Sequence, residues 1–251
     1  MPNRPRITLT KEELQRADIP LNHVLIELIY KSEGLKTKGG ITVGFLEDTT
    51  LGDGSAHPAD VAEIFGRVIK LPQKLYFNPE DQNNSMDWDC EMELQVGDIV
   101  WFSVLESKNA VEILCDEVLY RSVPYSDCYC AKREYTWQDV PDNETAEVII
   151  PLNGFVLCRQ CYMPQISPLD AISDTIIDKS RGTIAYLGKP VRAYLRPEYS
   201  DVSNLEVGDE VIFDPKAPLF LLERTKELAM FEDDNLFWVV LRRRIIFVNN
   251  K

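Results

Sequence analysis

Apolar residues occur along most of the chain in short runs rich in Val, Ile, Leu and aromatic residues, and Gly, Pro, Asp and Asn separate these runs. This pattern is typical of β-strands bounded by turns. One stretch differs, because Thr10 followed by Glu13 matches the capping-box pattern and good helix formers fill residues 11–17. We therefore predict an all-β fold with long loops and one short N-terminal helix.

The predicted strands fall into two series along the chain. The first comprises residues 23–30, 62–71, 98–104, 110–114 and 117–123, and the second comprises residues 147–150, 154–161, 182–187, 191–195, 210–213 and 236–248. Many short strands with little helix favour a barrel or a sandwich.

The two series share sequence motifs in the same order, which indicates an internal repeat. The run Leu-Gln-Val-Gly-Asp-Ile-Val-Trp-Phe at 94–102 returns as Leu-Glu-Val-Gly-Asp-Glu-Val-Ile-Phe at 205–213. Two further matches keep this order: Pro-Leu-Asn at 20–22 with 151–153, and a glycine-led strand at Gly66 with one at Gly182. Three motifs in one order argue against chance.

Both copies of the Val-Gly-Asp motif predict a tight turn that leads into a strand with alternating faces. We expect Gly97 and Gly208 to supply a positive φ, which glycine adopts without steric cost. Asp98 and Asp209 can then accept hydrogen bonds from nearby backbone amides. We therefore interpret both aspartates as structural rather than catalytic.

Taken in order, the motifs of the first series resemble a subunit of the GroES-type co-chaperonins. The resemblance includes a Pro-Leu lead-in, a glycine-rich loop, the Val-Gly-Asp turn, a Glu-Val-Leu strand at 117–119 and a Ser-Asp ending at 126–127. It covers residues 19–131 well and extends to residues 148–248 through the repeat. It implies two tandem GroES-like small β-barrels in a divergent member of the family, of cellular or viral origin.

The resemblance also predicts how the chain is divided into domains. An N-terminal extension covers residues 1–18, and a first barrel covers residues 19–135. A linker at 136–147 leads to a second barrel at 148–251. Between two strands of the first barrel lies a long polar, acidic loop, where the family has a short hairpin over the central opening of its ring.

The glycine-rich loop, at residues 34–60, is the most specific part of the resemblance. In the family, this mobile loop carries a Gly-Gly pair and then a short hydrophobic tripeptide that docks on the chaperonin. The resemblance assigns three docking residues: Ile41, Thr42 and Val43. It assigns three glycines as hinges of the loop: Gly39, Gly40 and Gly44. The alternative is a hairpin turn that only enters a strand.

The second copy has no Gly-Gly pair in the corresponding stretch, residues 162–180. Ile176 and Ile177 are candidates for a second docking element there. The alternative is a loop that packs back on its own barrel.

Charge bears on the choice of partner, because 41 acidic and 27 basic residues give a net charge of −14. Such a surface repels the phosphates of nucleic acids. The cluster Arg242-Arg243-Arg244 lies inside an apolar run, so we interpret it as an edge-strand or interface feature rather than a nucleic-acid patch.

No apolar run has the length of a membrane helix, and the first ten residues lack the apolar segment of a signal peptide. We therefore expect no membrane partner and a cytoplasmic location, which for a viral protein means the host cytoplasm or the virion.

The six cysteines are expected to be free thiols, since nothing in the sequence indicates secretion. Cys128-x-Cys130 and Cys158-x-x-Cys161 suggest a zinc site, but residues three apart on a strand point to opposite faces. We therefore favour buried apolar thiols over a metal site.

These features predict a co-chaperonin-like protein that forms a homo-oligomeric ring and docks on a GroEL-type chaperonin to assist protein folding. The alternative is a ring or scaffold structural protein, such as a bacteriophage virion component, that reuses the barrel without binding a chaperonin. An enzyme is not expected, because no Gly-x-Gly-x-x-Gly follows a strand and His23 and His57 lack partners at useful spacing. We predict no catalytic residues and no cofactor.

Overall fold

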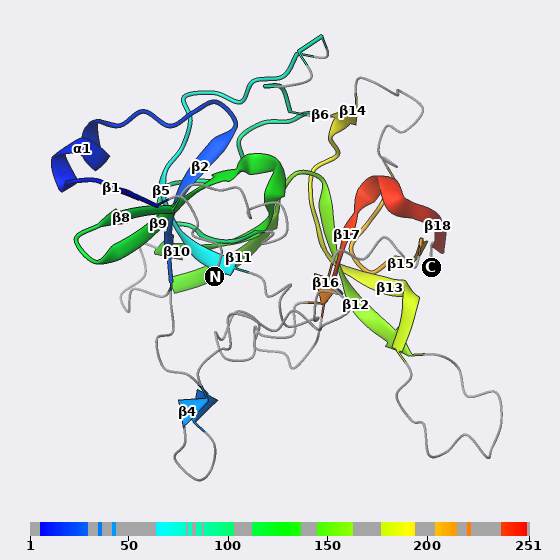
Figure 1. Ribbon diagram of the computed structural model, residues 1–251. Helices are drawn as coiled ribbons and strands as arrows, with labels where there is room; N and C mark the ends of the chain where they lie inside the picture. The colour runs from blue at the N-terminus through cyan, green and yellow to red at the C-terminus, as the bar shows by residue number, and fades with distance from the viewer. Residues whose placement is uncertain are drawn as a thin grey trace, which may run out of the picture. The chain divides into compact units, whose positions relative to one another are not determined.

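Figure 1 shows the computed structural model of the chain. The structure describes residues 6–29, 35–36, 42–43, 64–78, 80–81, 84–86, 88–102, 112–136, 145–162, 177–193, 204–214, 220–221 and 237–249. The chain forms two compact units. Unit 1 comprises Met1–Lys74 and Leu94–Cys128, and unit 2 comprises Leu75–Glu93 and Tyr129–Lys251.

Unit 1 is built on an antiparallel sheet. Its described elements are β1 (Arg6–Thr8), α1 (Lys11–Arg16), β2 (His23–Leu28), β3 (Leu35–Lys36), β4 (Thr42–Val43), β5 (Ile64–Lys70), β7 (Ile99–Phe102), β8 (Glu112–Cys115), β9 (Val118–Pro124) and the 3₁₀ helix η2 (Tyr125–Asp127). Strand pairing gives the order β1-β8-β9-β2-β5-β7, in which only β1 and β8 are parallel. A separate antiparallel pair is formed by β3 and β4.

Unit 2 also consists of strands. They are β6 (Trp88–Asp89), β10 (Cys128–Thr136, from its second residue), β11 (Thr145–Pro151), β12 (Phe155–Tyr162), β13 (Ile177–Leu187), β14 (Arg192–Ala193), β15 (Glu210–Phe213), β16 (Phe220–Leu221), β17 (Phe237–Leu241) and β18 (Ile245–Asn249), with the 3₁₀ helix η6 (Arg242–Arg244) before β18. The main sheet has the order β16-β17-β12-β13-β15-β18. Two antiparallel pairs accompany it, β10 with β11 and β6 with β14.

The prediction of an all-β chain with a short N-terminal helix is confirmed. Helix α1 begins after Thr10, whose hydroxyl accepts the N–H of Glu13, while the Glu13 carboxylate accepts the N–H of Thr10. These bonds from Thr10 lower the pKa of Glu13. At the other end, the Lys70 ammonium donates to three backbone carbonyls, those of Leu14, Gln15 and Ala17. Among the described strands no sheet closes on itself, so the barrel form stays a prediction.

The repeat predicted from the motifs is present in the strand pairing. The order β8-β9-β2-β5-β7 in unit 1 matches the order β16-β17-β12-β13-β15 in unit 2. Both copies also carry a register shift at the same place, between Leu25 and Ile26 on β2 and between Leu157 and Cys158 on β12. We call these two sets of strands the first and the second repeat.

The pairing corrects one detail of the sequence match. His23 lies opposite Pro124, and Phe155 lies opposite Leu241. The N–H of His23 donates to the carbonyl of Pro20, and the N–H of Phe155 donates to that of Leu152. Pro20 therefore corresponds to Leu152 and not to Pro151. The turn of the second repeat holds two positive-φ residues, Asn153 and Gly154, where the first has only Asn22, and the extra residue shifts the register.

The Val-Gly-Asp turns have the predicted geometry in both repeats. Gly97 and Gly208 adopt φ of 98° and 100°. Asp98 accepts the N–H of Gln95 at 2.7 Å, and Asp209 accepts the N–H of Glu206 at 2.8 Å. Both aspartates therefore close a turn, as predicted.

Two strand predictions near the ends of the repeats were wrong. Residues 236–248 do not form one strand, because η6 interrupts it at the arginine triplet. The triplet therefore lies on a 3₁₀ helix rather than on an edge strand. Arg242 is buried and donates to the carbonyl of Gly188. Strand β10 was not among the predicted strands, although its cysteines were expected to be buried.

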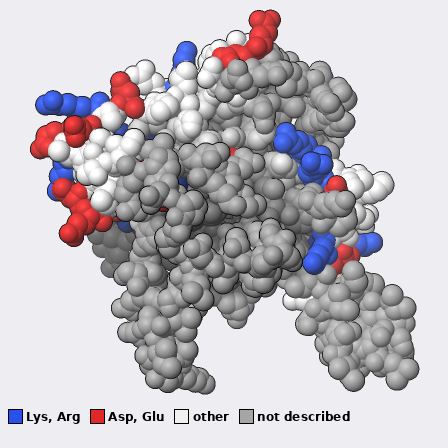
Figure 2. All heavy atoms as spheres, in the orientation of Figure 1, with Lys and Arg blue, Asp and Glu red and all other residues white. Residues whose placement is uncertain are grey.

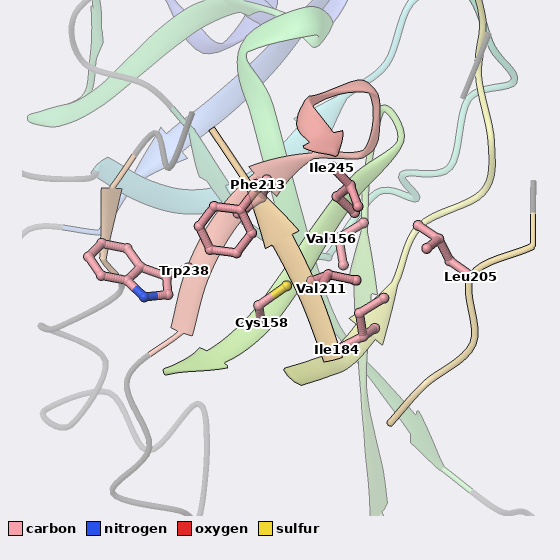
Figure 3. Packing of buried hydrophobic residues seen from close by; sticks show 9 residues of the cluster. Val156, Cys158, Ile184, Leu205, Val211, Phe213, Trp238 and Ile245 are labelled. Atoms are coloured by element: carbon pink, nitrogen blue, oxygen red, sulfur yellow. The ribbon is translucent and has the colours of Figure 1, made fainter. Parts of the chain in front are cut away.

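The core of unit 2 lies between β12, β13, β15, β17 and β18, as Figure 3 shows. Its buried members are Val156, Cys158, Ile184, Leu205, Val211, Phe213, Trp238, Val240 and Ile245. Each comes from a strand or turn of the second repeat, so the motifs that define the repeat also build its core.

Candidate functional site

The predicted docking loop is described only in part. Thr42 and Val43 form β4, and their backbone pairs with Lys36 and Leu35 on β3. Ile41 and the predicted hinges Gly39, Gly40 and Gly44 lie outside the described residues. Their roles therefore stay predictions.

The second predicted docking element is also described in part. Ile177 begins β13, where its backbone pairs with Tyr162, and Ile176 lies outside the described residues. The structure thus places one residue of this element in a ladder of unit 2.

The acidic loop of the first copy forms a strap, residues 75–93, that belongs to unit 2. The strap is not only polar, because the side chains of Met86 and Trp88 are buried. It is organised by local hydrogen bonds, including one from the N–H of Asn78 to the hydroxyl of Ser85 at 2.7 Å. Sequence analysis noticed the length and charge of this loop but not its buried tryptophan.

The end of the strap converges on Asn153, in the turn that opens the second repeat. The indole N–H of Trp88 donates to Oδ1 of Asn153 at 3.3 Å, and the thiol of Cys90 donates to the same oxygen at 3.5 Å. The N–H of Asn153 donates to Oε2 of Glu93 at 2.9 Å. This turn is fully buried, so the strap replaces the hydrogen bonds that water would otherwise supply.

Further contacts hold the strap along its length. Trp88 and Asp89 on β6 pair with Ala193 and Arg192 on β14. The guanidinium of Arg243 lies 5.0 Å from the centroid of the Trp88 ring, in a cation–π contact. The arginine triplet therefore has a structural partner within unit 2.

The cysteines are free thiols in mostly buried positions, as predicted. Burial raises the pKa of the Cys128 and Cys158 thiols. Burial, together with the charges of Glu93 and Asp89, raises the pKa of Cys90 to about 12. Groups that stay protonated in this way are poor metal ligands and poor nucleophiles. Within the described residues no cluster of metal-ligating side chains is found.

Unit 1 has an open groove of about 540 Å³ beside the segment that leads from α1 into β2. Ala17, Ile19 and Leu21 line one side of the groove, and Ile69 and Val96 also contribute to its lining. Leu21 and Val96 are exposed. The groove is therefore an apolar surface next to a turn.

Charged side chains alternate in sign over the part of unit 1 that holds α1, as Figure 2 shows. The ion pair between Lys11 and Asp116, at 2.9 Å, is one example. Such mixing gives no basic surface on this part of the described chain for phosphates to bind. In the described parts of the sequence, no helix is both long and apolar enough to cross a bilayer.

No protein-family model matches the sequence, and no curated protein matches it as a relative. The argument for a function therefore depends on the chain's own residues and on its repeated fold.

Proposed function

We propose that this protein is a divergent tandem member of the GroES-type co-chaperonins, which forms a ring and docks on a GroEL-type chaperonin through the loop at Ile41, Thr42 and Val43. The observation that carries the proposal is the duplicated strand order, with a Val-Gly-Asp turn of the same geometry in each repeat. The motifs that resemble the family thus occur at equivalent positions of a repeated β-fold.

The β3–β4 pair supports the position of the docking element. Thr42 and Val43 lie on the second strand of a short antiparallel pair. A hairpin of this kind can present apolar side chains from the end of a long loop. The two alternatives for this stretch, a docking loop and a hairpin, are therefore compatible.

The proposed binding is weak for one loop and strong for a ring. An apolar side chain that becomes fully buried contributes about 1.5–3 kcal/mol, and ordering the loop offsets part of this. Several loops on one ring bind together, so the effective concentration of the later loops multiplies the affinity. Such binding is tight but releasable, which suits a partner that must leave after each folding cycle. No catalytic residue or cofactor takes part.

The proposal is tested by measuring the affinity of the protein for a purified GroEL-type chaperonin in the presence of nucleotide. We expect Ile41→Ser/Val43→Ser to weaken binding at least tenfold, because the variant removes two apolar anchors. Val207→Ser is the matched control, since Val207 is also an exposed valine but lies on the turn of the second repeat. The variant Ile176→Ser/Ile177→Ser tests the second docking element in the same assay.

The strap favours one alternative function, that of a ring or scaffold structural protein. Its burial of Met86 and Trp88 and its pairing with β14 give it the character of a permanent structural part. If wild type and all loop variants fail to bind the chaperonin while the protein still assembles, the docking proposal is wrong and the scaffold function gains support.

A further inference from the structure

Equivalent residues at the ends of the two repeats differ sharply in exposure. Each repeat closes with a 3₁₀ helix and then a strand, so counting from η2 and η6 matches Tyr129 with Ile246 and Cys130 with Phe247. Tyr129 is 6% exposed and Cys130 is fully buried. Ile246 is 57% exposed and Phe247 is 66% exposed. The second repeat thus ends in a strand whose apolar side chains are uncovered.

The first repeat shows what covers this position. Strand β11, which leads into the second repeat, pairs with β10 from Cys130 opposite Pro151 to Thr136 opposite Thr145. The N–H of Leu152 donates to the carbonyl of Tyr129 at 2.8 Å. The ring of Phe155 meets the ring of Tyr129 edge to face, with centroids 5.1 Å apart. We call residues 145–155 the second lead-in, since they join β10 to the start of the second repeat.

The corresponding segment of the first repeat is uncovered. We call residues 17–23 the first lead-in. Within it, Leu21 is the structural counterpart of Asn153, and it is 47% exposed whereas Asn153 is fully buried. Beside Leu21 lies the open groove of unit 1, with the exposed side chain of Val96 in its lining.

The chain therefore makes one complete contact and leaves both halves of a second one exposed. A strand that follows a 3₁₀ helix binds a lead-in within unit 2, whereas β18 and the first lead-in are each uncovered. Edge strands with exposed apolar side chains are ready sites for association. When the two halves are different surfaces, the contact between chains is heterologous and propagates from chain to chain.

We propose that β18 of one chain binds the first lead-in of a second copy of this chain. Ile246 and Phe247 then lie against Leu21 and the groove next to Val96. Helix α1 ends at Arg16 and Ala17 is extended, with φ −62° and ψ 128°, so the backbone available for pairing begins there. The ladder between chains is therefore shorter than the one between β10 and β11. This inference rests on the ring-forming part of the proposed function and names the surfaces that form the ring.

The test uses two full-length variants, each with one surface blocked. Ile246→Asp/Phe247→Asp places charge on β18 and leaves the first lead-in intact. Leu21→Asp/Val96→Asp does the reverse. All four positions are exposed, so both variants should fold, and circular dichroism and thermal unfolding verify this. Tyr162→Asp is the control, because Tyr162 is 58% exposed but lies on neither surface.

Native mass spectrometry and sedimentation velocity give the readout. We expect wild type and the control to form closed oligomers, and each blocked variant alone to be a monomer. An equimolar mixture of the two variants should form a heterodimer and nothing larger, because one intact β18 meets one intact first lead-in.

Three results would overturn the inference: a monomeric wild type, a Leu21→Asp/Val96→Asp variant that still dimerises through β18, or a mixture that forms no heterodimer. None of these depends on the chaperonin. Loss of chaperonin binding by Ile41→Ser/Val43→Ser with assembly unchanged would leave this inference intact, and failed assembly with retained chaperonin binding would overturn it alone.

Discussion

The rings of Tyr129 and Phe155 meet edge to face, at an interplanar angle of 84°. Tyr129 lies on the strand that closes the first repeat, and Phe155 is the first residue of β12 in the second. Both are buried. This contact therefore links the end of one repeat to the start of the next within unit 2.

We expect Phe155→Ala to destabilise unit 2 by about 3–5 kcal/mol, since it removes a buried aromatic side chain and leaves a cavity. Phe155→Leu and Tyr129→Leu should each cost less. A double-mutant cycle on the two leucine variants should give a coupling of about 0.5–1.5 kcal/mol, the usual value of an aromatic pair. Urea unfolding followed by tryptophan fluorescence measures these differences. Additive effects would contradict the ring contact.

The two Val-Gly-Asp turns provide an internal comparison. Gly97→Ala and Gly208→Ala should each cost about 1–3 kcal/mol, because an L-residue at φ near 100° is strained. A Cβ at either position meets no other atom, so the cost comes from the backbone alone. We therefore expect the two variants to lower the midpoint of thermal unfolding by similar amounts. A large cost in one repeat and none in the other would contradict the shared geometry.

A buried ion pair distinguishes the first repeat from the second. Nη2 of Arg121 lies 2.8 Å from Oε1 of Glu112, and both side chains are nearly inaccessible to solvent. We expect Glu112→Leu to cost about 3–5 kcal/mol, since it leaves a buried charge without its counter-ion. Glu112→Leu/Arg121→Leu should recover most of this loss, because the double variant buries no charge. A double variant as unstable as the single one, in the same denaturation assay, would contradict this account.

The Cys90 thiol should be nearly inert at neutral pH. Its pKa is raised to about 12, and the thiolate is the form that reacts with alkylating reagents. Burial favours the neutral thiol, so we expect labelling of Cys90 to accelerate about tenfold for each pH unit up to the pKa. Mass spectrometry of peptides from protein labelled at pH 7, 8 and 9 gives the rates, and protein unfolded in guanidinium supplies the reference. Labelling of folded Cys90 at the unfolded rate would show that the strap does not bury it.

The local parts of the fold could be predicted from the sequence because short segments determine them. The capping box around Thr10 and the turns at Gly97 and Gly208 depend on neighbouring residues alone. The repeat could be predicted because identical turn residues recur in order. These features require no knowledge of what lies beside them in space.

The features that were missed depend on contacts between distant segments. The one-residue shift between Pro20 and Leu152 arises from the extra positive-φ residue at Gly154, which composition does not show. The role of Trp88 depends on its hydrogen bond to Asn153, which is far away in sequence. The exposed Ile246 and Phe247 resemble the other apolar strand residues until their partners are known. A sequence pattern predicts that a residue lies on a strand, but not whether another strand covers it.

Electron microscopy of the protein mixed with a GroEL-type chaperonin and nucleotide tests the central claim most directly. We predict side views of the chaperonin cylinder with added density at its end, and loss of that density with Ile41→Ser/Val43→Ser. Bare cylinders beside intact rings of the wild-type protein would contradict the proposed docking.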